Sequence, residues 1–195
     1  MKAIRIVLIL WILTALIYPT TIFGVAQLPM FQTVANGSIR QSLDSHQPIG
    51  SSLIGQNFTS DKYFHGRPST VRYSQGRIAR PYGISGGSNL APSNPNLFIR
   101  VMETASKLQD ENIPLNSDLL YTSASGLDPH ISERSARSQI ERVARSRGWE
   151  PQELLPLIRE YTTGKFLGIF GEAGVNVLRL NYALDLKDFD RQRRR

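Results

Sequence analysis

The long uncharged stretch near the N-terminus constrains this chain most, because such a run suits only a membrane-spanning helix or a signal peptide. After Lys2 and Arg5, no charged residue occurs before Arg40. Residues 6–27 are long enough, at about 1.5 Å per helical residue, to cross a hydrocarbon core of about 30 Å. We therefore expect a short N-terminal segment at 1–5 and a transmembrane helix at 6–27.

A cleaved signal peptide is the alternative for the same stretch. Its apolar part would be residues 6–18, and the small residues at 24–26 would precede the cut. The apolar character resumes after Pro19, however, which favours a retained anchor. Pro19 removes one helix hydrogen bond, and neighbouring Thr and Tyr hydroxyl groups can satisfy the freed carbonyl groups.

The cations around this stretch predict its orientation. Two cations and the amino terminus precede the span, and Arg40 is the first cation after it. The positive-inside bias places the N-terminus in the cytoplasm and the chain from about residue 30 onward outside. We expect a single-pass protein of the cytoplasmic (inner) membrane, with the lipid bilayer as one partner.

The net charge of +7 first suggests nucleic acid as a partner, but the positions of the charges argue against it. Six of the 23 Lys and Arg residues lie within 1–5 and 191–195, which leaves 17 against 16 acidic residues in between. A nearly neutral domain is not expected to bind nucleic acid. The chain has no cysteine, which excludes disulfides and thiolate metal sites.

Residues 30–186 read as one small extracytoplasmic α+β domain, followed by a basic, disordered tail at 187–195. Strands are expected from the patterns at 49–58, 118–121 and 165–170, after a turn at Asn36-Gly37. Helices are expected from Pro95, from the cap Ser132 to Gly148, and from Pro151 to near Gly164. Residues 174–185 remain open between strand and helix.

The faces of two of these helices can also be predicted. Leu97, Val101, Ala105 and Leu108 form one apolar stripe of the first. In the second helix, we expect the apolar residues to face inward and the arginines, including Arg142 and Arg147, to face solvent.

The stretch "SGGSNLAPSNP" at 85–95 has two glycines before a helix, where free N–H groups could hold a phosphate. It lacks the P-loop pattern, and no lysine lies nearby. Glycines for a tight turn and Ser, Asn and Pro for helix entry are the favoured interpretation.

The stretch "SASGLDPHIS" brings Ser125, Asp128 and His130 within six residues. A Ser-His-Asp hydrolase needs these groups to converge with an oxyanion hole, and the Gly-x-Ser-x-Gly elbow is absent here. A turn is the favoured interpretation, and an anchored or secreted hydrolase using Ser125 and His130 is the alternative function. The chain has three histidines, His46, His65 and His130, and they lie far apart in the sequence. We therefore expect no metal site.

Five motifs occur in order behind the single span, and together they closely resemble the C subunit of the Kdp-type potassium-transporting ATPase. The resemblance covers nearly the whole chain up to Asp185. The motifs are "GSSLIGQNFTSDKYFHGRPS" (50–69), "SGGSNLAPSNP" (85–95), "TSASGLDPHIS" (122–132), "QIERVARSRG" (139–148) and "VNVLRLNYALD" (175–185).

This resemblance implies a non-catalytic accessory subunit of a high-affinity, ATP-driven potassium uptake complex. The implied partners are a channel-like potassium-binding subunit, a P-type ATPase subunit and a very small F subunit that assists assembly. The C subunit is implied to stabilise the complex and to act as a catalytic chaperone that raises the ATP affinity of the ATPase subunit. The implied cofactor is ATP, held transiently, and candidate nucleotide contacts by analogy are Ser85, Gly86, Gly87, Ser88 and Gln139.

The predicted orientation conflicts with direct ATP contact, because ATP is inside and a charged nucleotide does not cross hydrocarbon unaided. We therefore expect the domain to cap the outer mouth of the channel-like subunit and to affect ATP binding indirectly. The turn-rich stretch 63–95 would be the docking surface, since aromatic residues and arginine dominate interface energetics. The docking candidates are Tyr63, Phe64, Arg67, Asp128 and His130.

Overall fold

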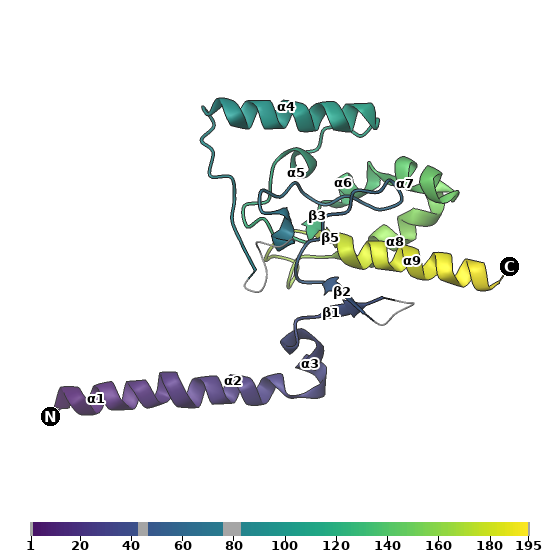
Figure 1. The fold of residues 1–195 in the computed structure, drawn as a ribbon. Helices are drawn as coiled ribbons and strands as arrows, with labels where there is room; N and C mark the ends of the chain where they lie inside the picture. The colour runs from purple at the N-terminus through teal and green to yellow at the C-terminus, as the bar shows by residue number, and fades with distance from the viewer. Residues whose placement is uncertain (1, 43–46, 76–82, 195) are drawn as a thin grey trace. The chain divides into compact units, whose positions relative to one another are not determined.

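The computed structural model describes residues 2–42, 47–75 and 83–194, so the prediction for His46 lies outside the described residues. The chain divides into two compact units, residues 1–51 and 52–195. The fold class is α+β, with one apolar helix at the N-terminus (Figure 1).

The first unit begins with one apolar helix of 25 residues, from Lys2 to Ala26, whose side chains are exposed. Its length and composition are sufficient to cross a membrane, and they fit a membrane-anchored protein. It consists of α1 (Lys2–Trp11), a π-helical run (Ile12–Ile17) and α2 (Tyr18–Ala26). The wider π-helical turns directly precede Pro19, whose ring would otherwise crowd the preceding turn. Thr21 Oγ1 donates to Ile17 O at 2.8 Å, as expected for a hydroxyl near a proline.

The remainder of the first unit contains α3 (Pro29–Ala35) and a two-stranded antiparallel sheet of β1 (Ile39–Gln41) and β2 (Pro48–Ser51). The predicted turn at Asn36-Gly37 is present, with Gly37 at φ +79°. A helix rather than a strand precedes the turn. The strand predicted at 49–58 is shorter than expected, because β2 ends at Ser51.

The second unit contains one small sheet and several helices (Figure 1). The sheet has three antiparallel strands in the order β3-β5-β4. Its strands are β3 (His130–Ile131), β4 (Thr162–Thr163) and β5 (Gly174–Asn176), and its α-helices are α4 (Pro95–Asp110), α5 (Ser117–Leu120), α6 (Glu133–Arg137), α7 (Ile140–Arg147), α8 (Leu154–Glu160) and α9 (Val177–Arg193). Short 3-10 turns occur at Arg72–Ser74 and Pro151–Glu153.

The core lies where α6, α8 and α9 pack around β5. The central β5 carries Val175 into this core, fully buried. The largest buried side chains around it are Phe64, Val143, Leu154, Ile158, Leu180 and Leu184.

Helix α4 begins as predicted, with the Asn94 side chain accepting from Asn96 N and with Pro95 in the first turn. Its predicted stripe is half-buried, and no residue of α4 is fully buried. The helix contacts α5, and in Figure 1 it lies at the edge of the second unit, away from the sheet.

The predicted helix from Ser132 to Gly148 is two helices, because α6 and α7 are interrupted at residues 138–139. The predicted ends are confirmed: Ser132 Oγ accepts from Ser135 N, and Gly148 stops α7 at φ +64°. Arg142 and Arg147 do not face solvent as expected, since their side chains are 9% and 2% exposed. Both are buried against acidic groups.

Two other local predictions differ from the structure, and one open alternative is resolved. The strand expected at 118–121 is instead α5, and residues 165–170 form a tight turn closed by a bridge between Phe166 and Phe170. Residues 174–185 contain both alternatives, β5 followed by α9.

The segment expected as a disordered tail is helical, since α9 continues to Arg193. Tertiary contacts explain this difference. Lys187 and Arg191 both pair with Glu153, and both lie over the ring of Trp149, at 5.3 and 4.4 Å from its centroid. These contacts hold the last turns of α9 against the domain.

Candidate functional site

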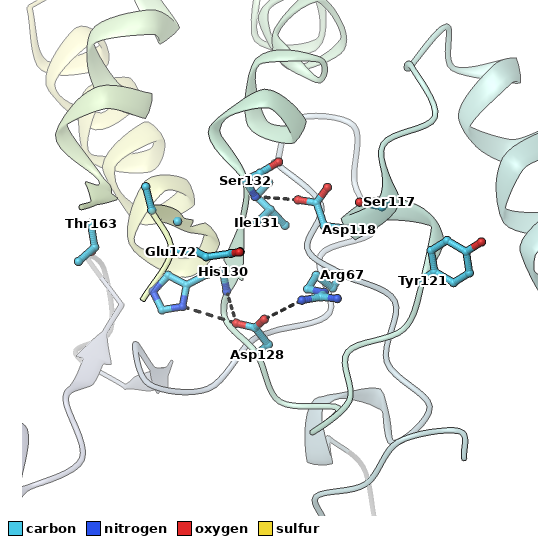
Figure 2. A pocket seen from close by; sticks show the side chains of 12 residues that line it. Arg67, Ser117, Asp118, Tyr121, Asp128, His130, Ile131, Ser132, Thr163 and Glu172 are labelled. Carbon is cyan, nitrogen blue, oxygen red and sulfur yellow. Dashed lines mark hydrogen bonds and ion pairs between the residues drawn. The ribbon is translucent and has the colours of Figure 1, made fainter. Parts of the chain in front are cut away.

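A cleft of about 660 Å³ opens beside β3 and is lined by three of the residues that the sequence singled out. Its lining combines one arginine, three carboxylates and a histidine (Figure 2). The residues are Arg67, Ser117, Asp118, Tyr121, Asp128, His130, Ile131, Ser132, Thr163, Glu172, Ala173 and Gly174. Three of the predicted docking residues, Arg67, Asp128 and His130, are therefore brought together.

Asp128 is the centre of this group, with a neighbour on each carboxylate oxygen (Figure 2). Its Oδ2 pairs with Arg67 Nη1 at 3.1 Å, while Oδ1 accepts from His130 N at 3.0 Å and lies 3.5 Å from His130 Nδ1. The His130 side chain, then the His130 backbone N–H and Arg67, lower the pKa of Asp128. The carboxylate is therefore ionised at neutral pH, and it is about one-third exposed.

The turn before Asp128 depends on Gly126. Its φ is +68°, and a Cβ there would lie 2.4 Å from Val71 Cγ2 and 2.6 Å from Gly86 O. Only glycine fits this conformation and this contact. Gly126 thus lets three chain segments meet beneath the cleft.

A second carboxylate, Asp118, forms another wall of the cleft and closes the N-terminal end of α6. Its Oδ2 accepts from Ser132 N at 2.7 Å, and its Oδ1 accepts from Ser135 Oγ. Burial raises the pKa of Asp118, but the hydrogen bonds from Ser135 and Ser132 together lower it below its usual value. The negative charge of Asp118 lies at the N-terminal end of α6, where it is favourable, and its side chain forms part of the cleft wall.

The extended segment that carries Arg67 is held by two buried amide side chains, which we call the amide clamps. Asn181 of α9 accepts from Phe64 N at 2.8 Å and donates to Phe64 O at 2.9 Å. Gln139, at the start of α7, accepts from His65 N at 2.7 Å and donates to His65 O at 3.0 Å. Asn181 and Gln139 are 1% and 0% exposed. Side-chain amides thus replace the neighbouring strands that would otherwise bind an extended backbone.

The other two docking candidates lie outside the cleft. Phe64 is fully buried in the core, so its side chain presents no surface to a partner. Tyr63 is half-buried, with its hydroxyl donating to Asp185 Oδ2 at 3.0 Å and Arg147 over its ring at 5.1 Å. Tyr63 and Phe64 therefore join the segment to α9 and the core.

The candidate nucleotide contacts occupy two different places. Residues 85–88 run beside residues 123–126, where Gly86 N donates to Ser125 O at 2.8 Å, and Ser85 Oγ donates to the same oxygen at 2.9 Å. A Cβ on Gly87 would lie 2.7 Å from Ala124 O, so close packing explains that glycine. Gln139 is one of the amide clamps and also lines a separate pocket next to the segment of Arg67. Residues 85–88 do not line that pocket, so the two sets of candidate contacts do not share one site. Direct nucleotide contact stays a prediction.

The Asp128–His130 contact is the only part of a hydrolase triad that residues 125–130 assemble in the described structure. Ser125 Oγ contacts Ser123 Oγ at 3.2 Å and accepts from Leu127 N at 3.1 Å. Ser125 does not line the cleft that contains His130. The alternative of a serine hydrolase therefore has no support.

The chemistry available in the cleft is charge recognition. Asp128 and Arg67 are held rigidly and are about one-third exposed, so each has a face left for an ionic or hydrogen-bonding partner. Among the described residues, no group of three or more His, Asp or Glu is placed to hold a metal ion.

Sequence reasoning missed Asp118 and Asn181 as functional elements. A signal existed for Asn181, which is a lone amide within the apolar run "VLRLNYAL" on the same face as Val177 and Leu184. Asp118 gave no such signal, because its partners Ser132 and Ser135 lie far along the chain.

Comparison with known proteins shows similarity over nearly the whole chain. The family model described as "K+-transporting ATPase, c chain" (KdpC) matches residues 1–186. The chain is 62% identical over 192 residues to "Potassium-transporting ATPase KdpC subunit 2" of Nostoc sp., covering 98% of this chain and 96% of the relative. It is 54% identical over 183 residues to "Potassium-transporting ATPase KdpC subunit" of Synechocystis sp., covering 94% of this chain and 95% of the relative.

Proposed function

The chain belongs to the KdpC family, the c chain of K+-transporting ATPases, and from this premise we propose that it is a membrane-anchored accessory subunit of an ATP-driven potassium uptake complex. The transported ion of that complex is potassium. The proposed partners are the channel-like potassium-binding subunit, the P-type ATPase subunit and the small F subunit.

The partly exposed Arg67–Asp128–His130 group carries the proposal that this subunit docks through the cleft. Its charges are fixed before any partner arrives, since the amide clamps hold the segment of Arg67 and β3 holds His130. Binding then costs little ordering of these side chains. An arginine in such a setting is a frequent anchor of protein interfaces.

We place the second unit on the outer face of the cytoplasmic membrane, at the mouth of the channel-like subunit. The cations before the apolar helix support this orientation. A cysteine at Ser125 provides the test, because this position is exposed and the chain has no other cysteine. A membrane-impermeant maleimide should label Ser125→Cys in intact cells, and protection that disappears on lysis would contradict this placement.

In this proposal the subunit raises the ATP affinity of the ATPase subunit indirectly, by fixing the arrangement of its partners. The clamp role of Gln139 supports an indirect effect, since both ends of its amide are already bonded to His65. A photoreactive ATP analogue added to the purified complex should label the ATPase subunit and leave this chain unlabelled. Labelling of residues 85–88 would indicate direct contact.

The docking proposal is tested by copurification from detergent-solubilised membranes. Arg67→Ala should reduce recovery of the channel-like subunit by on the order of tenfold, because an interface arginine commonly contributes 1–2 kcal/mol or more. Growth at low potassium should fall with it.

A matched control is Arg137→Ala, which removes an arginine of similar exposure paired with Glu133 on α6. Both substitutions should change the free energy of unfolding by less than about 1 kcal/mol, as is usual for partly exposed pairs. Equal recovery with both variants would reject the cleft as the docking surface.

A further inference from the structure

The turn at residues 165–171, which we call the apolar tip, has four large apolar side chains that remain exposed among the described residues of the second unit. Phe166, Leu167, Ile169 and Phe170 are 71, 73, 75 and 62% exposed. Scattered exposed apolar side chains are ordinary, but four within five residues form a contiguous patch. Such a patch indicates contact with an apolar surface outside the domain.

The backbone of the apolar tip is paired within itself. Phe166 N donates to Phe170 O at 2.8 Å, and Phe170 N donates to Phe166 O at 2.9 Å. Gly168 N donates to Lys165 O and Ile169 N to Phe166 O, at 3.1 and 3.2 Å. Positive φ at Leu167 and Gly168 closes the turn. The tip is therefore a preformed apolar knob with most of its N–H groups already satisfied.

The internal hydrogen bonds of the apolar tip favour lipid as its contact surface. In hydrocarbon or at its boundary, an N–H group without a partner is costly, so a segment that enters lipid has to satisfy its backbone internally. The charges lie at the base of the tip, at Lys165 and Glu172, where they can remain in water or among headgroups.

Another exposed apolar patch shows the contrast. Phe98, Ile99 and Met102 of α4 are 68, 52 and 53% exposed, but the exposed Glu103 lies one helical turn from Ile99. Charges within a patch oppose insertion into lipid. The apolar tip has no charged residue between Lys165 and Glu172.

We propose that the apolar tip inserts into the boundary region of the lipid bilayer, as a second and reversible membrane contact. The bilayer is the occupant because the apolar helix Lys2–Ala26 keeps the domain tethered beside it. A tethered surface is present at a high effective concentration, so even a weak apolar contact is populated. None of the four apolar side chains of the tip lines the docking cleft, although Glu172 at its base does.

The test uses the full chain, whose lack of cysteine permits a single label. Ile169→Cys carries an environment-sensitive nitrobenzoxadiazole fluorophore, and the protein is reconstituted into vesicles of phosphatidylethanolamine and phosphatidylglycerol. Lipids with a spin-labelled acyl chain serve as quenchers. Ser106→Cys, exposed on α4, carries the same label as the control.

The proposal predicts blue-shifted emission at position 169 and loss of most of that emission with spin-labelled lipid, while position 106 remains unquenched. Adding Leu167→Asp and Phe170→Asp to the labelled Ile169→Cys chain should restore emission typical of water. These exposed side chains contact no core residue, so the fold should persist, as circular dichroism can verify.

Two results would overturn the proposal. Water-like, unquenched emission at position 169 would show that the apolar tip stays in solvent. Blue-shifted emission that lipid quenchers do not reduce would show that the tip is buried against protein, either a second copy or another subunit.

Discussion

Replacing Asn181 by leucine tests whether the amide clamps hold the segment that leads to the cleft. Leucine has the same branched shape and is somewhat larger, so the change removes the amide and leaves no empty space. It leaves Phe64 N and Phe64 O buried without partners, since both bond only to Asn181 among the described contacts and Phe64 is fully buried.

The magnitude follows from these two backbone groups. Each buried unsatisfied group costs about 1–3 kcal/mol, and burying the leucine side chain returns about 1 kcal/mol. The free energy of unfolding should therefore fall by about 1–5 kcal/mol, a large share of the 5–15 kcal/mol that is typical of a domain.

The assay is denaturant unfolding of the full chain in detergent micelles, followed by the fluorescence of Trp149, which is 7% exposed. Trp11 is replaced by phenylalanine in every sample so that Trp149 alone reports. Gln192→Leu, at an exposed position of the same helix, is the control and should change stability by less than about 0.5 kcal/mol. If Asn181→Leu were as stable as Gln192→Leu, the clamp would not hold the segment.

Three further changes can be measured in the same unfolding assay. Burial, and next the charge of Arg142, lower the pKa of His65 to about 4. Between pH 6.5 and 4 the unfolded chain therefore binds more protons than the folded chain, and the free energy of unfolding falls as the pH drops through this range. His65→Gln should remove about 2 kcal/mol of that pH dependence, after allowance for partial exposure. Gly126→Ala should cost about 3 kcal/mol or more, because it combines a positive φ with a contact at 2.4 Å. Arg147→Met should lower the free energy of unfolding by about 2 kcal/mol, because it removes a buried guanidinium that pairs with Asp185. The loss stays moderate because Asp185 is partly exposed and can bond to water once its partner is gone.

The contrary results are distinct. An unchanged pH profile in His65→Gln would show that the histidine is not held neutral in the folded state. Wild-type stability of Gly126→Ala would mean that the segments beneath the cleft can separate at little cost. Wild-type stability of Arg147→Met would show that the ion pairs of Arg147 with Asp185 and Asp188 do not stabilise the end of α9.

The sequence predicted features that local chemistry determines. The apolar helix, the helix start at Pro95, the cap at Ser132 and the stop at Gly148 each depend on residues within one or two turns. The family resemblance was confirmed by similarity over nearly the whole chain.

Features that depend on distant partners were predicted poorly. The helix break at residues 138–139 places Gln139 against His65, a contact across 74 positions of sequence. The tail is helical because Glu153 and Trp149 bind its cations, at a separation of about 38 positions. Residues 165–170 have the composition of a strand, yet they form the turn in the connection between the antiparallel strands β4 and β5. Local periodicity contains no information on such pairings.

The amide clamps carry no net charge, so their hydrogen bonds respond little to changes in salt concentration or pH. Added salt weakens the attraction between Arg67 and Asp128, because both are partly exposed, but it leaves neutral amide bonds in the interior almost unaffected. Mild acid likewise leaves Asn181 and Gln139 unprotonated. The backbone that carries Arg67 therefore keeps its geometry under conditions in which the affinity of the surface changes. Salt concentration then alters the strength of binding without altering the shape of the binding surface.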